Sequence, residues 1–117
     1  MSAIIGKRFD ANDPSTYGTR PDGSQKGAGY FGLLKRPNGD ISTELSIGVG
    51  IGGKEVDIPT LVPGLTKQEI NYLLTTEPNP RGLPESIVRK AVDHAKMRMA
   101  MGKSPFAEPG EQVELPK

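Results

Sequence analysis

The stretch that decides the fold is LSIGVGIGGKEVDI, residues 45–58. From Leu45 to Ile51 apolar side chains alternate with serine or glycine, and the alternation resumes after Gly52-Gly53. A period of two is typical of a strand with one buried face. Two consecutive glycines supply the positive φ angles of a tight turn. We therefore predict a β-hairpin, with Ile51 opposite Lys54, Val49 opposite Val56 and Ile47 opposite Ile58.

This register puts the apolar side chains of the hairpin on one face, so the pairing is self-consistent. The other face is polar or glycine and carries Ser46, Gly48, Gly50, Glu55 and Asp57. Glycines there leave room for another surface to approach closely. Carboxylates that alternate with an apolar face are ordinarily solvated, so we assign no acid–base catalysis to Glu55 and Asp57.

A further strand is expected before the hairpin. Residues 30–34 are joined to a strand that begins near Ile41 by Pro37-Asn38-Gly39-Asp40, which is a turn signal. Pro59 ends the last strand and is typical of a sheet edge. The sequence thus predicts an antiparallel β-meander of about three strands.

Two helices are expected after the strands. Thr66-Lys67-Gln68-Glu69 is a capping box that starts a short helix, which stops before residues 77–80. Pro84 opens a longer helix at its first position, and Gly102 is suited to end it. An apolar stripe at helical spacing runs along the longer helix: Ile87, Val88, Ala91, Val92, Ala95 and Met99. We predict a small α+β fold in which both helices pack on the apolar face of the meander.

The two ends of the chain lack such patterns. The apolar residues of the first 29 positions have neither helical nor strand period, so we expect an arm that is disordered or laid along a partner. A proline-containing tail follows the longer helix, and Phe106 is placed to pack back onto the helix end. The predicted organisation is an extended arm over 1–29, an α+β domain over 30–102 and an extended tail over 103–117.

Composition limits the size of the core. The chain has 117 residues, of which 15 are glycine and 11 are proline, and only 34% are hydrophobic. A core drawn from the middle of such a chain is near the lower limit for independent stability. A self-associating or larger partner surface would add the stability that this core lacks.

Charge and residue types argue against several functional classes. A formal net charge of +1 does not favour strong binding to a nucleic-acid backbone. Without cysteine there is neither a disulfide framework nor a thiolate metal site. No stretch approaches the ~20 apolar residues that span a bilayer, and no signal peptide is visible. We expect a chain that is made and used without secretion, with no cofactor, no bound metal and no membrane span.

Two G-x-G-x-x-G matches occur, one at Gly27, Gly29 and Gly32 and the other at Gly48, Gly50 and Gly53. A nucleotide-binding loop needs a strand before it and a helix N-terminus after it, because the helix amides bind phosphate. The first match leads into a strand, and the second is a strand with its turn. We interpret both as turn and hairpin glycines.

His94 is the only histidine and borders the apolar stripe of the longer helix. A general base needs a partner and a nucleophile or water site. Asp93 points elsewhere on the helix, and Lys90 disfavours a protonated imidazole. We interpret His94 as a boundary or surface residue, and we predict no catalytic residues, no metal ligands and no enzymatic activity.

Candidate contact residues fall into two groups. Basic and aromatic side chains are interleaved in the arm and the first strand, a composition that could suit nucleic acid if acidic residues were not mixed among them. Two methionines of the longer helix lie off its apolar stripe and would offer adaptable contact surface. The predicted partner-contact residues are Tyr17, Arg20, Tyr30, Phe31, Met97 and Met101.

Five segments together resemble a known kind of protein. They are QKGAGYFG at 25–32, STELSIGV at 42–49, GKEVDIPTLVP at 53–63, IVRKAVDHA at 87–95 and GKSPFA at 102–107. The series resembles small uncharacterised proteins of tailed bacteriophages, often short-tailed ones, and a module of large multi-domain phage proteins. The resemblance covers about 17–107. It implies a phage setting and a virion structural or ejection-associated role, and it implies no catalytic residues.

We therefore predict a structural or assembly component of a phage particle, at the head, portal or tail, that acts by protein–protein contact. It would be made in the host cytoplasm and located in the virion, in several symmetry-related copies beside other virion proteins. One alternative is a phage effector that inhibits a host protein or sequesters a small ligand. A second is a nucleic-acid-binding accessory protein, and an enzyme has the least support.

Overall fold

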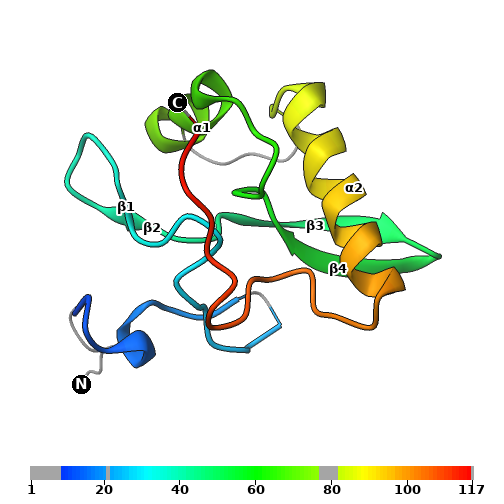
Figure 1. The fold of residues 1–117 in the computed structure, drawn as a ribbon, viewed down its shortest axis with the longest axis horizontal. Helices are drawn as coiled ribbons and strands as arrows, with labels where there is room; N and C mark the ends of the chain where they lie inside the picture. Colours follow the sequence, from blue (N-terminus) through cyan, green and yellow to red (C-terminus); the bar gives the residue numbers. More distant parts are fainter. Residues whose placement is uncertain (1–8, 21, 77–81, 117) are drawn as a thin grey trace.

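The computed structural model of the chain describes residues 9–20, 22–76 and 82–116. It confirms the predicted small α+β fold with antiparallel strands and two helices (Figure 1). The elements are a 3-10 helix η1 (Pro14–Thr16), strands β1 (Leu34–Lys35), β2 (Ile41–Ser42), β3 (Ser46–Ile51) and β4 (Lys54–Pro59), and helices α1 (Lys67–Thr75) and α2 (Glu85–Ala100).

The β3–β4 hairpin has the predicted register. Ile51 pairs with Lys54, and the two turn glycines between them, Gly52 and Gly53, have φ angles of +61° and +81°. Positive φ at both positions is the type I′ turn whose twist matches that of the strands. The apolar face is buried most deeply at Ile47 and Ile58, against which α2 packs its alanines, Ala91 and Ala95.

The sequence predicted one continuous meander, but the strands form two separate two-stranded sheets, β1–β2 and β3–β4. The break lies between β2 and β3, where Leu45 has a φ of +46°. An extended strand cannot pass through that backbone conformation. Next to it Glu44 turns its side chain into the protein, where it is 1% exposed. The expected continuous strand from about Ile41 is therefore split by an inward-pointing acid.

The two helices pack on different parts of the molecule rather than both on the hairpin. Ile70 and Leu73 of α1 join a cluster with Tyr30, Leu61 and Val62. The second cluster is formed by the hairpin and the middle of α2. Figure 1 shows α2 crossing the β3–β4 hairpin while α1 lies at the other end of the domain. The core thus has two parts, and α2 contributes to both.

Both helix starts lie where the sequence predicts, to within one residue. The Thr66 hydroxyl accepts the Glu69 N–H at 3.1 Å and the Glu69 carboxylate accepts the Thr66 N–H at 2.8 Å, so the capping box is complete. Pro84 precedes the first residue of α2 instead of being that residue. After α2, Gly102 has a φ of +75°, and the Lys103 N–H donates to the Arg98 carbonyl at 2.9 Å. This is the expected glycine-terminated helix end.

The apolar stripe of α2 was predicted wrongly at its end. Met99 is 40% exposed, and Arg98 occupies the buried position, where it is 5% exposed. Helical spacing from Ala91 and Ala95 leads to position 98 rather than 99, and an arginine can lie there because its donors are satisfied within the protein.

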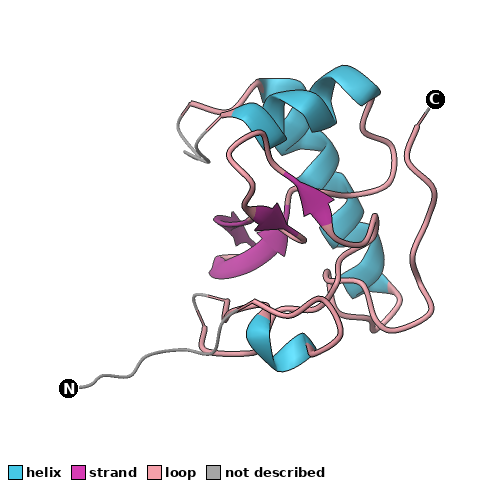
Figure 2. Cartoon of the chain, turned by 90° about the vertical axis from the view of Figure 1, so that its left-hand side faces the viewer, coloured by secondary structure: helices cyan, strands magenta, loops and turns pink. Residues whose placement is uncertain are grey.

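Both ends of the described chain contact the domain. The arm bends back on itself, pairs Thr19 with Gln25 and then passes the Thr43 backbone. The tail runs upward across the domain to α1, and the Val113 N–H donates to the Tyr30 carbonyl at 2.7 Å (Figures 1 and 2). Phe106 is buried, as predicted. The division into arm, domain and tail stays a prediction, and residues 1–8 lie outside the described part.

Candidate protein-contact surface

Arg20 of the arm forms a buried ion pair with Glu44. Its Nε and Nη2 atoms donate to the two carboxylate oxygens of Glu44 at 3.0 and 2.7 Å, so the pair is bidentate. The Gly27 N–H donates to the same carboxylate at 2.9 Å. The guanidinium carbon also lies 3.9 Å from the centre of the Phe106 ring. Because a buried carboxylate requires such partners, this pair fixes the arm to the domain.

Arg98 of α2 holds the tail in a similar way. Its Nη1 and Nη2 atoms donate to the carboxylate of Glu111, each at 2.7 Å. Its Nε atom donates to the Ser104 carbonyl at 2.8 Å, and Nη2 also donates to the Phe106 carbonyl at 3.0 Å. The hydrogen bonds from Arg98, with help from the Glu108 N–H, lower the pKa of Glu111 to about 2. The tail is thus bound through a charge on a helix of the domain.

Tyr30 and His94 meet beside these contacts. The Tyr30 hydroxyl donates to the Pro105 carbonyl at 2.8 Å, and burial raises the pKa of Tyr30 to about 12. The imidazole of His94 packs edge to face on the Tyr30 ring, with the ring centres 4.8 Å apart. Burial, and then the charge of Arg98, lowers the pKa of His94. Its Nε2 atom is buried without a hydrogen-bond partner in the described part of the chain. His94 is therefore a half-buried packing residue.

The aromatic candidates make contacts within the chain. The Tyr17 hydroxyl donates to the Ala11 carbonyl at 2.7 Å, and its ring stacks on Phe9 at 5.7 Å between centres. Phe31 is half-buried and packs against the cluster below α1. Tyr30 is 3% exposed and presents almost no surface to a partner. Six residues were predicted to contact a partner. The structure does not bring four of them, Tyr17, Arg20, Tyr30 and Phe31, together in one exposed patch.

The methionine candidates are exposed. Met97 and Met101 are 48% and 54% exposed and lie one turn apart at the end of α2. Met99, on the other side of the helix, is exposed as well. Exposed large apolar side chains elsewhere are Phe9 in the arm and Val113 and Leu115 in the tail. Methionines adapt their shape to a neighbour, so the end of α2 is the best-formed candidate contact surface. We call Met97 and Met101 the methionine end of α2.

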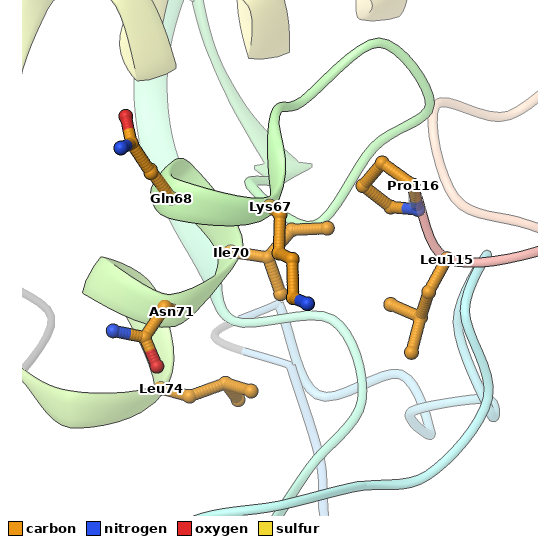
Figure 3. Close-up of a pocket in the computed structure, with 7 residues that line it drawn as sticks. All are labelled: Lys67, Gln68, Ile70, Asn71, Leu74, Leu115 and Pro116. Atoms are coloured by element: carbon orange, nitrogen blue, oxygen red, sulfur yellow. The ribbon is translucent and has the colours of Figure 1, made fainter.

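A groove lies between α1 and the tail (Figure 3). Its volume is about 440 Å³, and its walls are mostly apolar. Leu115 and Pro116 lie opposite Ile70, and Leu74 continues the α1 side. The groove exists because the tail crosses the domain, which the sequence did not predict.

Three arginines of the fold, Arg20, Arg36 and Arg98, are turned toward the protein, whereas Arg89 is exposed. Arg36 donates to the Leu73 and Thr76 carbonyls at 3.1 and 3.0 Å, at the end of α1. Arg20 and Arg98 bind carboxylates, as described. Guanidinium groups engaged in this way are not presented together to a phosphate backbone, which leaves the nucleic-acid alternative without a basic stripe on these side chains.

Within the described residues, no group of three or more histidine, aspartate or glutamate side chains is arranged to bind a metal ion. Neither helix in that part of the chain combines the length and hydropathy needed to cross a bilayer.

Sequence reasoning missed the three residues that organise both chain ends, Glu44, Arg98 and Glu111. For Arg98 a signal existed, since it continues the spacing of the buried alanines of α2. For the two glutamates the partners are 24 and 13 residues away, and no local pattern joins them.

Comparisons with family models, with curated proteins and with solved structures found no match to this chain. The resemblance to phage proteins therefore stays a prediction from the sequence.

Proposed function

We propose that this chain is a structural or assembly component of a phage particle that acts by protein–protein contact. The phage setting rests on the sequence resemblance, and the mode of action rests on the surface of the fold. The same proposal places it in the virion, beside other virion proteins and in several copies.

The observation that carries the mode of action is the methionine end of α2. Met97 and Met101 are half exposed on one side of a helix whose opposite side is committed to the hairpin. Large apolar side chains that gather on a surface favour contact with another protein. The helix itself is rigidly placed by its buried alanines, so this surface does not have to be ordered when a partner binds.

The two chain ends support the same reading. Each is irregular in structure and is joined to the domain through a bidentate arginine–glutamate pair, Arg20–Glu44 for the arm and Arg98–Glu111 for the tail. In the tail, Val113 and Leu115 are 41% and 49% exposed. Segments placed in this way extend the contact surface of a small domain beyond its own core.

Quantitative mass spectrometry of purified phage particles tests the proposal. We expect the chain in a fixed number of copies per particle that does not fall through successive density-gradient steps. A free effector would instead be abundant in infected cells and absent from purified particles, and that result would overturn the virion role.

A further inference from the structure

The outer edge of β3 is a strand edge without protection. In the described part of the chain the hairpin is a two-stranded sheet, so each strand has one edge that the sheet does not use. On β4 the outer edge carries Lys54, Glu55 and Asp57 and ends at Pro59. Charges and proline are the usual means of preventing edge-to-edge pairing. On β3, by contrast, the sequence SIGVGI has neither a charge nor a proline.

The hairpin geometry fixes which backbone groups point outward from β3. In a two-residue type I′ hairpin the closing pair, here Ile51 and Lys54, exchanges both hydrogen bonds. The Thr60 N–H donates to the Leu45 carbonyl at 3.2 Å. Leu45 and Thr60 are an even number of residues from Ile51 and Lys54, respectively, so this bond fits the same alternating pattern. The N–H and C=O groups of alternate residues therefore point away from β4. On β3 these residues are Ser46, Gly48 and Gly50.

These outward groups are accessible. Gly48 and Gly50 are both exposed, and a Cβ atom added at Gly50 would meet nothing within 4 Å. No backbone hydrogen bond joins either glycine to the rest of the described chain outside the hairpin. The apolar side chains beside this edge, Val49 and Ile51, are only half-buried, because α2 lies over β4 more than over β3. Among residues 9–20, 22–76 and 82–116, nothing thus covers the edge or part of its apolar face.

We propose that the β3 edge pairs with β3 of a second copy of this chain, in antiparallel register about a two-fold axis near Gly48. This deepens the assembly role proposed above, and rests on it, by naming one partner as the chain itself. The edge is self-complementary, because alternation places outward backbone groups opposite one another, and a two-fold axis at Gly48 puts Val49 of one copy beside Ile47 of the other on the apolar face.

Charge favours pairing through β3 rather than through β4. The charged strand β4 would be the outer strand of the resulting four-stranded sheet. Strands lie about 4.8 Å apart, so the two β4 backbones would be separated by roughly 14 Å, although the Glu55 carboxylate leans toward Gly48, where an added Cβ atom would lie 2.7 Å from Glu55 Oε1. Pairing through β4 would instead bring the Glu55 and Asp57 carboxylates of the two copies together. A pair of six-residue strands buries less than the ~1,200 Å² of small stable interfaces, so we expect weak association.

Sedimentation velocity of the purified full chain, from about 10 μM to about 1 mM, tests the inference. We expect the mass to rise from that of the 12.5 kDa monomer toward twice this value. Gly50→Pro removes one outward N–H, leaves the hairpin ladder intact and should weaken association at least tenfold. Glu55→Pro is the matched control: it removes the outward N–H of the residue directly opposite, on the β4 edge, and should leave association unchanged.

If Gly50→Pro does not fold, Gly50→Lys provides the second test, because a charge on the edge should also weaken association without filling occupied space. A chain that is monomeric at about 1 mM would overturn the inference, and so would association that only Glu55→Pro reduces. Neither result bears on whether the chain is present in particles, and its absence from particles would leave the self-association measurement untouched.

Discussion

At the scale of single residues, glycine and arginine decide how the irregular segments are held. Gly29 shows the role of the first match to a nucleotide-loop pattern. A Cβ atom at this position would approach the Thr43 carbonyl oxygen far inside van der Waals contact, and the φ of Gly29 is +78°. The glycine is needed because the arm crosses the backbone between β2 and β3 at close range. The central glycine of the match is explained by this crossing and needs no phosphate.

Gly29→Ala should therefore be severely destabilising. Gly23 is the matched control, because it has a φ of +90° but a Cβ atom there would meet nothing within 4 Å. We expect Gly23→Ala to cost about 1–2 kcal/mol, from the left-handed backbone alone, and Gly29→Ala to cost more by at least ~2 kcal/mol. Urea denaturation of both variants measures the difference. Equal losses would mean that the arm does not cross Thr43 closely.

The Arg20–Glu44 pair makes a second prediction at this scale. Arg20→Met leaves the Glu44 carboxylate, 1% exposed, with only the Gly27 N–H, so we expect a loss of about 3–5 kcal/mol in unfolding free energy. Glu44→Gln should cost less, since the amide still accepts hydrogen bonds and Arg20 keeps its contact with Phe106.

Lys26→Met, in the same segment, serves as the control and should change stability by less than about 0.5 kcal/mol. Thermal and urea denaturation measure all three. A loss for Arg20→Met no greater than that for Lys26→Met would show that the arm is not held by this pair.

At the scale of elements, local patterns predicted what local physics determines. The register of the hairpin followed from alternation and the Gly52-Gly53 turn, and the start of α1 followed from the capping box. The prediction of a single meander was wrong because the strand is interrupted at Glu44. The inward position of Glu44 is determined by Arg20, which is far away in the sequence. The path of the tail was not predicted for the same reason, since it depends on the contact between Arg98 and Glu111. Of the predicted contact residues, Tyr30 proved internal because its hydroxyl binds the Pro105 carbonyl, 75 residues away.

The capping box of α1 can be tested directly. Thr66→Ala removes the hydroxyl that accepts the Glu69 N–H, and we expect a loss of about 1 kcal/mol. Thr75→Ala, the same change at the other end of α1, should stay within about 0.5 kcal/mol. Chemical denaturation compares the two. Losses in the reverse order would show that the start of α1 is not stabilised by its cap.

At the scale of the whole molecule, a small two-part core carries two long irregular segments. The tail depends on the ionised form of Glu111, whose pKa is lowered to about 2 by the hydrogen bonds from Arg98. A carboxyl group whose pKa is lowered in the folded state stabilises that state at pH values above its unfolded pKa of 4.5. This contribution is lost as the pH falls toward 2. The attachment of the tail should therefore weaken through this pH range.

Amide exchange and NMR shifts of residues 107–116, followed from pH 6 to pH 2, measure this release. We expect the Val113 amide, which donates to the Tyr30 carbonyl, to lose protection before the amides of α2 do. Glu111→Gln should lack the transition, whereas Glu108→Gln should retain it. A tail that stays protected at pH 2, or is lost only together with the helices, would contradict the role given to Glu111.

The central claim is that this chain binds other proteins of a particle through the methionine end of α2. Incorporation of a Met97→Lys/Met101→Lys variant into particles, relative to the unchanged chain expressed at the same level, tests it most directly. The control is Asp93→Lys/Lys96→Asp, which alters two exposed charged positions of the same helix. We predict at least a tenfold drop for the methionine variant and no change for the control. Equal incorporation of all three chains would contradict the account.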